Sequence, residues 1–590
     1  MEKNNRIFEH GEEVTVEPYK GAFAEEAGVS YYRITLDYAQ PTVPHNVRIS
    51  WFERLEDGFT VWTPGGGFDR GFRPSWRPVG TDSRSASGAP LIAVVSSRGK
   101  NVASAALSDA GTPSRMTAGI EESNGKIRFV VQLFTCLTEA VTHYETLLRV
   151  DISDRPYYES LKSIRRFWTE VGYAPAYVPV DAKRAMFSSW YCFQKDVDGE
   201  RLLKQCAVAK EYGMDTVILD DGWQTDEIQS GYTRCGDWEP VPSKFPDMRR
   251  FVDRLHGMGM KCILWYSVPF VGKYAKNVDR FRGMYLRARD REETVMILDP
   301  RFAEVRHWLT ETYKRAVSDW ALDGLKLDFI DSFSLAPDSP ENYDAMDCPS
   351  LEAAVEKLLS EIMTELKKIN QEIMIEFRQS YIGPVMQKYG NMLRVGDCAG
   401  GAIINRVNGL TLRLLTEGTA VHSDMLLWDY DAKPENAADQ LSNILFLVPQ
   451  ISVMPEKLSD PHRLMLKHYL NFMDINRDVL LDGYLVPLAP EANYGQVYAG
   501  KDGRVIAALY ENPLFEIPDG TKTLTVVNAG ASDCVVLCGT DRKGGALWTV
   551  TDCMGNPVDE GKLGNQDKIV SFAVPHNGFL TVTTCDKNRK

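Results

Sequence analysis

The stretch Gly324-Leu-Lys-Leu-Asp-Phe329 decides the interpretation of this chain, because it reads as a short buried strand with two charged side chains. Side chains alternate along a strand, so Lys326 and Asp328 point to one side and the two leucines to the other. An ammonium group beside a carboxylate keeps that carboxylate ionised at neutral pH. At the mouth of an α/β barrel, Asp328 would therefore be a candidate nucleophile.

The segments on both sides of this strand alternate between strand-like and helical patterns. Strand-like runs begin near residues 185, 216, 261, 324, 373, 392, 419 and 451, and helical patterns cover residues 199–212, 303–322 and 351–369, with another starting near Met248. Eight strands, each followed by a helix or loop, predict a (β/α)8 TIM barrel. A doubly wound sheet is the alternative, but the glycine-rich first turn expected of it is absent from the sequence.

Short strand-like runs separated by Gly, Pro, Ser and Asp fill both flanks of the barrel pattern. Before the barrel they include residues 31–36, 91–95 and 127–134, which predict an N-terminal β-sandwich. After the barrel they include residues 504–510, 523–527 and 578–583, which predict a C-terminal antiparallel β-sandwich. The predicted domains are therefore residues 1–178, 179–483 and 484–590.

The composition excludes several classes of partner. The chain has 590 residues and a formal net charge of −14, which argues against nucleic acid or an anionic membrane as a partner. No apolar run approaches the roughly 20 residues that span a bilayer, and the N-terminus shows no apolar signal region. Eleven scattered cysteines without a Cys-x-x-Cys pair predict reduced thiols. We therefore expect a cytoplasmic protein.

Carboxylates and aromatic side chains collect at the predicted carboxyl ends of the barrel strands, where barrel enzymes place their catalytic groups. In chain order they are Trp190, Asp220, Asp221, Trp223, Trp265, Lys326, Asp328, Glu376, Arg378, Asp397, His422 and Asp424. Each alone has an ordinary explanation as a turn, a salt bridge or core, and only their joint occurrence favours a site. Histidine is scarce, so we expect no metal or other cofactor. Carboxylates and indoles suit sugar hydroxyls and ring faces, and paired carboxylates hydrolyse glycosides, so an oligosaccharide or glycoside substrate is predicted.

These motifs resemble glycoside hydrolase family 36, the melibiase-type α-galactosidases, in the superfamily that also holds families 27 and 31. Asp220-Asp-Gly-Trp223 is similar to the strand-2 motif of that group, and Lys326-Leu-Asp328 is similar to its Lys-x-Asp nucleophile motif. Asp397 falls where the acid/base aspartate of the family lies. The order of sandwich, barrel and β domain also agrees. The resemblance implies a retaining exo-α-galactosidase.

The resemblance also implies roles for single residues. Asp328 would attack the anomeric carbon, while Asp397, with a raised pKa, would protonate the leaving oxygen. Asp220 and Asp221 would hold the sugar 4- and 6-hydroxyls, and Lys326 would assist at positions 3 and 4. Substrate contacts are further expected from Trp190, Trp223, Trp265, Arg378 and Asp424.

Three departures from the family pattern leave alternatives open. The usual Glu-x-Cys is Glu376-Phe-Arg378, the usual Ser-Asp is Gly396-Asp397, and the usual Trp-x-Glu-Pro is Trp265-Tyr-Ser-Val-Pro269. Arg378 could reach a substituent or an anion at the sugar 2-position, so an α-N-acetylgalactosaminidase or a glycosyltransferring relative is an alternative. A carbohydrate-binding protein built on a degenerate barrel is a third reading. Because oligomers are common in the family, a homo-oligomer is one expected state, with the loop 62–68 reaching a neighbouring site.

Overall fold

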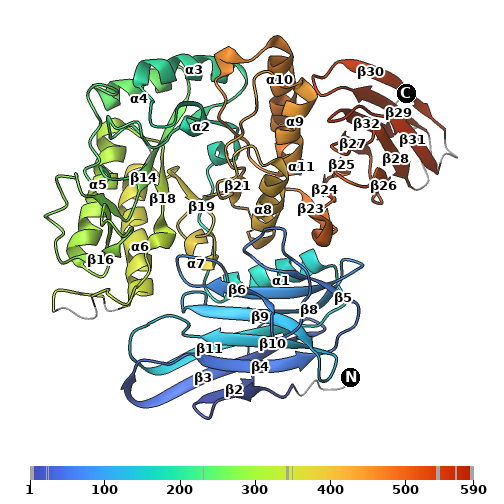
Figure 1. The fold of residues 1–590 in the computed structure, drawn as a ribbon. Coiled ribbons are helices and arrows are strands. Elements are labelled where there is room, and N and C mark those ends of the chain that lie inside the picture. Colours follow the sequence, from blue (N-terminus) through green and yellow to red (C-terminus); the bar gives the residue numbers. More distant parts are fainter. Residues whose placement is uncertain are drawn as a thin grey trace.

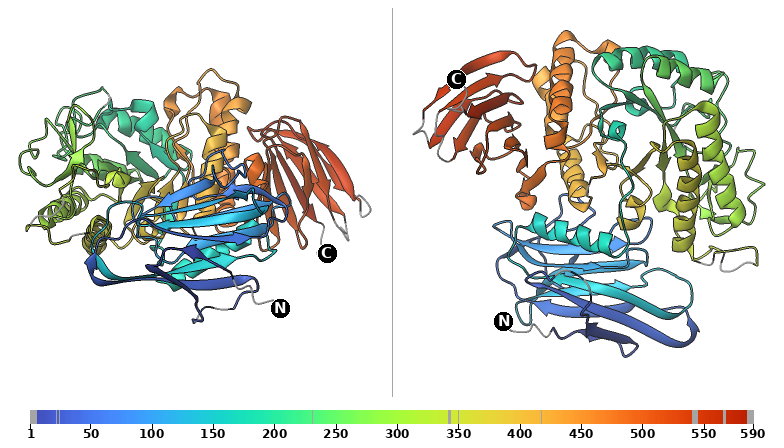
Figure 2. Two further views of the ribbon diagram at one scale, coloured as in Figure 1. Left: turned by 60° about the horizontal axis from the view of Figure 1, so that its bottom comes forward. Right: turned by 180° about the vertical axis from the view of Figure 1, so that it is seen from behind.

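In the computed structural model the chain forms a central α/β barrel with β-sheets before and after it in the sequence (Figure 1). The structure describes residues 6–21, 23, 25–229, 231–340, 344–348, 350–416, 418–539, 545–564 and 568–584. The N-terminal sheets lie below the barrel in Figure 1, and the C-terminal sheets lie at its side, as the two further views in Figure 2 also show.

Eight parallel strands form the barrel, in the places that the sequence predicts. They are β12 (Met186–Ser188), β13 (Thr216–Leu219), β14 (Lys261–Ser267), β18 (Gly324–Asp328), β19 (Met374–Arg378), β20 (Met392–Arg394), β21 (Ala420–His422) and β22 (Gln450–Ile451). Val448, just before β22, closes the ring by pairing with the end of β21, since its N–H donates to the Val421 carbonyl at 2.8 Å. The TIM barrel prediction is therefore confirmed.

Apolar side chains fill the amino-terminal end of the barrel interior. They come from successive strands and include Met186, Ile218, Ile263, Met374 and Met392, which pack into one buried cluster. Charged side chains such as Lys326 and Asp328 occupy the other end of the same interior. The barrel is thus a packed core that presents polar groups only where its strands finish.

Helices cover the outside of the barrel. They are α2 (Trp190–Phe193), α3 (Gly199–Glu211), α4 (Met248–Gly257), α5 (Ala303–Trp320), α6 (Leu351–Ile369), α7 (Pro384–Gln387), α8 (Ala402–Leu415), α9 (Pro434–Asn443), α10 (Asp460–Ile475) and α11 (Arg477–Leu480). Asp198 and Asp247 begin α3 and α4 by accepting backbone N–H bonds at 3.0 and 2.9 Å. Short 3-10 turns lie at Val180–Lys183, Ile330–Ser332, Pro455–Lys457 and Pro490–Ala492.

Two elements were not predicted from the sequence. A small antiparallel sheet, formed by β15 (Phe270–Gly272), β16 (Tyr285–Ala288) and β17 (Val295–Leu298), is inserted between β14 and α5. Helix α1 (Tyr157–Glu170) lies between the N-terminal sheets and the barrel and contacts α8 (Figure 1). The inserted sheet matters for the site because it brings residues 270–298 beside the strand ends.

The N-terminal part is a sandwich of two sheets around one apolar core, as predicted. One sheet contains β1 (Glu9–His10), β4 (Val47–Glu53), β6 (Val79–Ser83), β9 (Ser114–Glu121) and β10 (Lys126–Leu133). The other contains β2 (Val14–Pro18), β3 (Val29–Thr42), β5 (Gly58–Trp62), β7 (Leu91–Ser96), β8 (Asn101–Leu107) and β11 (Val141–Asp151). The loop 62–68 packs on its own barrel, where the Gly67 N–H donates to Asn408 at 3.0 Å.

The C-terminal part consists of a seven-stranded and a three-stranded sheet with a shared apolar core. The larger sheet contains β23 (Tyr484–Leu488), β24 (Gln496–Lys501), β25 (Arg504–Leu509), β27 (Thr523–Asn528), β29 (Ala546–Thr551), β30 (Pro557–Leu563) and β32 (Phe579–Thr584). The smaller contains β26 (Leu514–Glu516), β28 (Cys534–Cys538) and β31 (Ile569–Ala573). Most pairs are antiparallel as predicted, but β25 pairs with β27 and β26 with β28 in parallel.

Candidate active site

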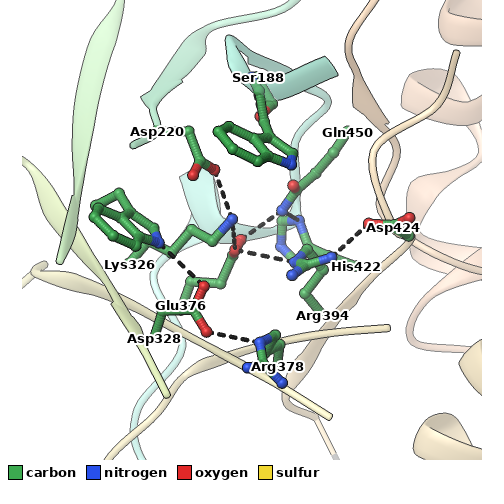
Figure 3. A network of polar contacts seen from close by, with 12 residues as sticks. Ser188, Asp220, Lys326, Asp328, Glu376, Arg378, Arg394, His422, Asp424 and Gln450 are labelled. Carbon is green, nitrogen blue, oxygen red and sulfur yellow. Dashed lines mark hydrogen bonds and ion pairs between the residues drawn. The ribbon is translucent and has the colours of Figure 1, made fainter. Parts of the chain in front are cut away.

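Charged side chains from neighbouring strands meet inside the carboxyl-terminal end of the barrel (Figure 3). Lys326 on β18 donates to Asp220, which follows β13, with 2.6 Å between Nζ and Oδ2. The same ammonium group lies 3.9 Å from Glu376 on β19. Lys326 and Asp328 both project into this network, so the alternation read from the sequence holds in the structure.

Asp328 is a buried carboxylate with donors on both oxygens. Its Oδ1 accepts from Arg378 Nε at 2.6 Å and from the Phe329 N–H at 2.8 Å, and its Oδ2 accepts from Trp265 Nε1 at 3.0 Å. Burial by itself would raise the pKa of Asp328, but the charges of Arg378 and Lys326 outweigh it and lower that pKa. Asp328 is thus ionised, and its direct ion-pair partner is Arg378, while Lys326 acts from further away.

The backbone immediately after Asp328 is strained. Phe329 has φ 65°, in the left-handed region that non-glycine residues rarely adopt. Such conformations cost roughly 1–3 kcal/mol and cluster at functional sites. Here the turn gives Asp328 an N–H donor and leaves the Phe329 ring half-buried beside it.

Asp397 lies at the open side of the network and is held by Arg394. The Arg394 Nη2 donates to Asp397 Oδ1 at 2.9 Å, while 65% of the Asp397 side chain stays exposed. Partial burial favours a higher pKa for Asp397, but the Arg394 charge dominates and lowers that pKa. The raised pKa expected for an acid is therefore not observed, and in the free protein Asp397 is a carboxylate.

Arg394 was missed by the sequence reading and is the centre of the carboxylate network. It is 1% exposed, forms an ion pair with Asp424, and lies 3.6 Å from Glu376 as well as contacting Asp397. The sequence feature that could have revealed Arg394 is a single charged residue inside the otherwise apolar strand pattern Met392–Val395. An arginine there must point into the barrel and meet carboxylates, because burying it unpaired would be costly.

Asp221 forms a second, separate group with Lys195 and Gln224. Gln224 Nε2 donates to its Oδ1 at 2.7 Å, and Lys195 Nζ lies 3.5 Å from its Oδ2. Burial raises the pKa of Asp221 to about 6, against the charge of Lys195. Gly222 allows this approach, because a Cβ there would come within 2.7 Å of the Lys195 backbone and its φ is 122°.

Two residues expected to touch substrate lie behind the site instead. Trp223 is fully buried among aromatic rings, and its Nε1 donates to the Trp265 carbonyl at 3.0 Å. Asp424 is also fully buried and accepts from Arg394, from the Tyr191 hydroxyl and from the Cys398 N–H. Trp223 therefore supports Trp265, and Asp424 supports Arg394, because neither side chain is open to a ligand.

Half-buried aromatic residues border the carboxylates. Trp190 begins α2 at the rim, as predicted. Tyr232, which the sequence reading did not single out, stacks on Trp265 with 6.2 Å between ring centroids. Trp265 itself is 2% exposed and meets the site through its N–H bond to Asp328. Tyr232 lies in the long loop after β13, where no strand or helix pattern marks its position.

The two remaining strand-end residues, Glu376 and His422, are buried and bonded to other residues of the protein. Glu376 is fully buried and accepts from Gln450 at 2.5 Å. His422 is bonded to the Ala182 carbonyl at 2.8 Å and to Gln450 at 3.2 Å, and burial lowers its pKa to about 4, so its ring is neutral. Throughout the described ranges, no group of three His, Cys, Asp or Glu side chains is arranged to hold a metal ion.

Residues 175–383 match the family model described as Melibiase, which is the family that the motifs resemble. In the part of the chain that the structure describes, none of the helices combines the length and apolarity needed to cross a membrane.

Solved structures agree with this fold. An α-galactosidase of family 36 from Geobacillus stearothermophilus has a TM-score of 0.65 at 13% identity, over 98% of this chain and 88% of its own. An α-galactosidase from Lactobacillus brevis has a TM-score of 0.64 at 12% identity, over 99% of this chain and 86% of its own. At these identities the likeness shows the fold alone.

Two curated proteins are similar in sequence over shorter stretches. The "A type blood alpha-D-galactosamine galactosaminidase" of Flavonifractor plautii is 25% identical over 249 residues, which are 37% of this chain. An α-galactosidase of Lactobacillus acidophilus is 27% identical over 157 residues, which are 25% of this chain. The chain spans only about a fifth of the length of these relatives, 20% and 21%.

Proposed function

We propose that this protein hydrolyses terminal α-galactosyl residues of oligosaccharides or glycosides by a retaining mechanism. The observation that carries the proposal is Asp328, an ionised carboxylate at the end of β18 that Trp265 and Arg378 fix in place beside Lys326. The match to the Melibiase family supports a galactosyl substrate. The related Geobacillus stearothermophilus enzyme has been solved with raffinose and with stachyose, which are the kind of substrate we infer here.

The proposed reaction has two steps. First, an oxygen of Asp328 bonds to the anomeric carbon while the bond to the leaving oxygen breaks and Asp397 gives that oxygen a proton. Then Asp397 takes a proton from water, the water oxygen bonds to the anomeric carbon, and Asp328 leaves. The sugar is released with its original anomeric configuration.

The other polar groups would hold the sugar ring. Asp220 and Lys326 form one donor–acceptor pair and Asp221 with Lys195 another, so both sites can accept from and donate to hydroxyl groups. Trp190, which is half-buried at the rim, would contact the apolar side of a sugar with its ring. We propose that these residues bind the terminal galactosyl unit.

A panel of substrates tests the function. We expect the purified protein to cleave 4-nitrophenyl α-galactoside and melibiose and to leave 4-nitrophenyl α-glucoside intact. Proton NMR of the first product should show α-galactose. Release of β-galactose would contradict retention, and cleavage of only another α-glycoside would contradict the galactosyl specificity. Saturable sugar binding without turnover over a long incubation would support a carbohydrate-binding protein instead.

A second candidate function is hydrolysis of a galactoside with a substituent at the 2-position. Arg378 is bonded to Asp328 beside the reacting carboxylate, and one of the curated relatives is named for galactosamine. The same panel, extended with 4-nitrophenyl 2-acetamido- and 2-amino-α-galactosides, distinguishes the two candidates by kcat/KM.

Asp397→Ala should affect natural and activated substrates differently. The proposed acid is needed for melibiose, whose leaving oxygen is strongly basic, and hardly at all for nitrophenolate. We expect kcat to fall by about 10²–10⁴-fold on melibiose and much less on 4-nitrophenyl α-galactoside. Because the pKa of Asp397 is lowered, its protonated fraction grows as the pH falls, so the wild-type rate on melibiose should be highest on the acid side of neutrality.

The exposed Asp431→Ala variant, in a neighbouring loop, serves as the control and should match the wild type. Equal losses on both substrates in Asp397→Ala would show that this residue has another role. An unchanged rate on melibiose would exclude it as the acid.

A further inference from the structure

The loop 329–334 after the proposed nucleophile is surrounded by arginines from distant parts of the chain. Arg84, from the N-terminal sandwich, donates to the Asp331 carbonyl at 2.6 Å. Arg287, on β16 of the inserted sheet, donates to the Ser334 hydroxyl at 3.0 Å. These two guanidinium groups hold the loop through neutral oxygens, so their positive charges lie beside it.

Two more guanidinium groups lie on the ring of Phe329. The carbon of the Arg378 guanidinium is 5.0 Å from the ring centroid, and that of Arg289 is 5.7 Å from it. Arg289 also lies 5.0 Å from the Tyr232 ring and 4.9 Å from the Phe270 ring. Arg378 contacts Asp328 directly, and Arg289 lies on the ring of Phe329, the residue that follows Asp328.

Both guanidinium groups have donors to spare. Arg378 uses Nε for Asp328 and Nη1 for the Gln379 carbonyl at 2.6 Å, which leaves its Nη2 open. Arg289 is exposed, and within the described part of the chain its side chain forms neither an ion pair nor a hydrogen bond. A guanidinium group offers five N–H donors in a fork that fits a planar or tetrahedral oxyanion.

Arg287 is close enough to Arg84 and Arg289 for their charges to repel it. Burial lowers the pKa of Arg287, and the neighbouring charges of Arg84 and Arg289 lower it further. Three carboxylates nearby are already engaged, since Asp328 and Asp331 face Arg378 and Glu352 faces Arg84, while Asp338 acts against the lowering of the Arg287 pKa. Clustered like charges of this kind are stabilised when an anion binds between them.

We propose that Arg289 and Arg378 form an anion-binding subsite beside Asp328, which recognises a carboxylate or sulfate group carried by the glycoside substrate. The inference rests on the proposed function and sharpens its substrate class from neutral galactosides to acidic ones. Arg289 is oriented by its contacts with the rings of Tyr232, Phe270 and Phe329. Its side chain therefore loses less conformational entropy when a substrate binds.

Binding and turnover of matched ligands test the subsite. Calorimetry compares 2-O-carboxymethyl-galactose and galactose 2-sulfate with galactose, and kinetics compares the 4-nitrophenyl α-glycosides of the same three sugars. We expect the wild type to prefer at least one acidic ligand by about 10-fold or more, as charge-assisted hydrogen bonds allow. Arg289→Met should lower that preference by about 10-fold, and Arg289→Lys should lower it less.

Arg291→Met is the matched control, because Arg291 is exposed two residues further along the same insertion. It should leave the preference unchanged. Preference for the carboxymethyl ether alone would identify carboxylated sugars, and preference for the sulfate alone would identify sulfated sugars. A wild-type preference for neutral galactose in binding, or equal losses in Arg289→Met and Arg291→Met, would overturn the inference. If acidic ligands bind better but no α-galactoside is cleaved, the subsite stands and the proposed hydrolysis fails.

Discussion

Asp328→Ala is expected to lower kcat/KM for 4-nitrophenyl α-galactoside by at least about 10⁴-fold, the scale seen when a covalent nucleophile is removed. The carboxylates on the neighbouring strands are engaged by other groups. Asp220 and Asp424 are held by Lys326 and Arg394, and Glu376 is buried beneath the network. The loss should therefore appear in kcat, because the groups proposed to bind the sugar are unchanged.

Azide distinguishes a missing nucleophile from a damaged site. In Asp328→Ala, an azide ion can enter the space of the lost carboxylate, bond to the anomeric carbon and expel nitrophenolate in a single displacement. The product should be β-galactosyl azide, since one displacement inverts an α-glycoside. Asp338→Ala, at an exposed position in the loop that follows, should retain wild-type activity. Full activity in Asp328→Ala, or α-galactosyl azide as its product, would contradict the assignment.

The strands that carry the site were predictable because each is a short apolar run that ends in polar residues. Lys326 and Asp328 could be placed on one side of their strand from the period of two alone, and the structure brings both into the barrel. The strand-2 aspartates could be placed near them because carboxyl ends of parallel strands gather at one end of a barrel. The alternation of side chains along a strand and the geometry of the barrel were therefore sufficient to place these residues.

The partners of these residues were not predictable, because they depend on distances in three dimensions. Lys326 is bonded to Asp220, 106 positions earlier, and it is Arg378 that contacts Asp328 directly. The lowered pKa of Asp397 follows from Arg394, whose role becomes visible only when the interior of the barrel is assembled. Trp223 has the same motif position as the aspartates, yet its side chain points into the core.

The position of Arg289 was likewise not predictable from the sequence, because Arg289 lies on an inserted segment. Nothing in the pattern of residues 270–298 predicts that a small sheet would fold back over the strand ends. Only the ring contacts of Arg289 with Tyr232 and Phe329 place it beside the site. Loops and insertions carry specificity in barrel proteins for this reason, while the strands carry the common chemistry.

Arg394→Met is expected to cause the largest loss of stability. Arg394 is the buried partner of Asp424 and lies 3.6 Å from Glu376, so its removal leaves two buried carboxylates without that charge. Breaking a buried ion pair in this way costs about 3–5 kcal/mol of the free energy of unfolding. Arg249→Met is the control, because Arg249 is exposed and its one ion pair within the described residues is with Asp253, so its loss should cost less than about 1 kcal/mol.

The pH dependence identifies the cause of that loss. Burial already raises the pKa of Asp424 and of Glu376 in the folded protein, and without Arg394 both should rise further. A carboxyl group whose pKa is higher in the folded than in the unfolded protein stabilises the fold at low pH, and this stabilisation is lost as the pH rises through the folded-state pKa. The stability deficit of Arg394→Met relative to the wild type should therefore shrink at pH 5 and grow at pH 8. Adding Asp424→Asn to Arg394→Met should recover part of the lost stability, since the neutral amide needs no positively charged partner. Thermal unfolding of the wild type, Arg394→Met, Arg394→Met with Asp424→Asn, and Arg249→Met at pH 5 and pH 8 measures these differences in stability. A stability deficit that is independent of pH and unaffected by Asp424→Asn would assign the loss to packing of the methionine instead.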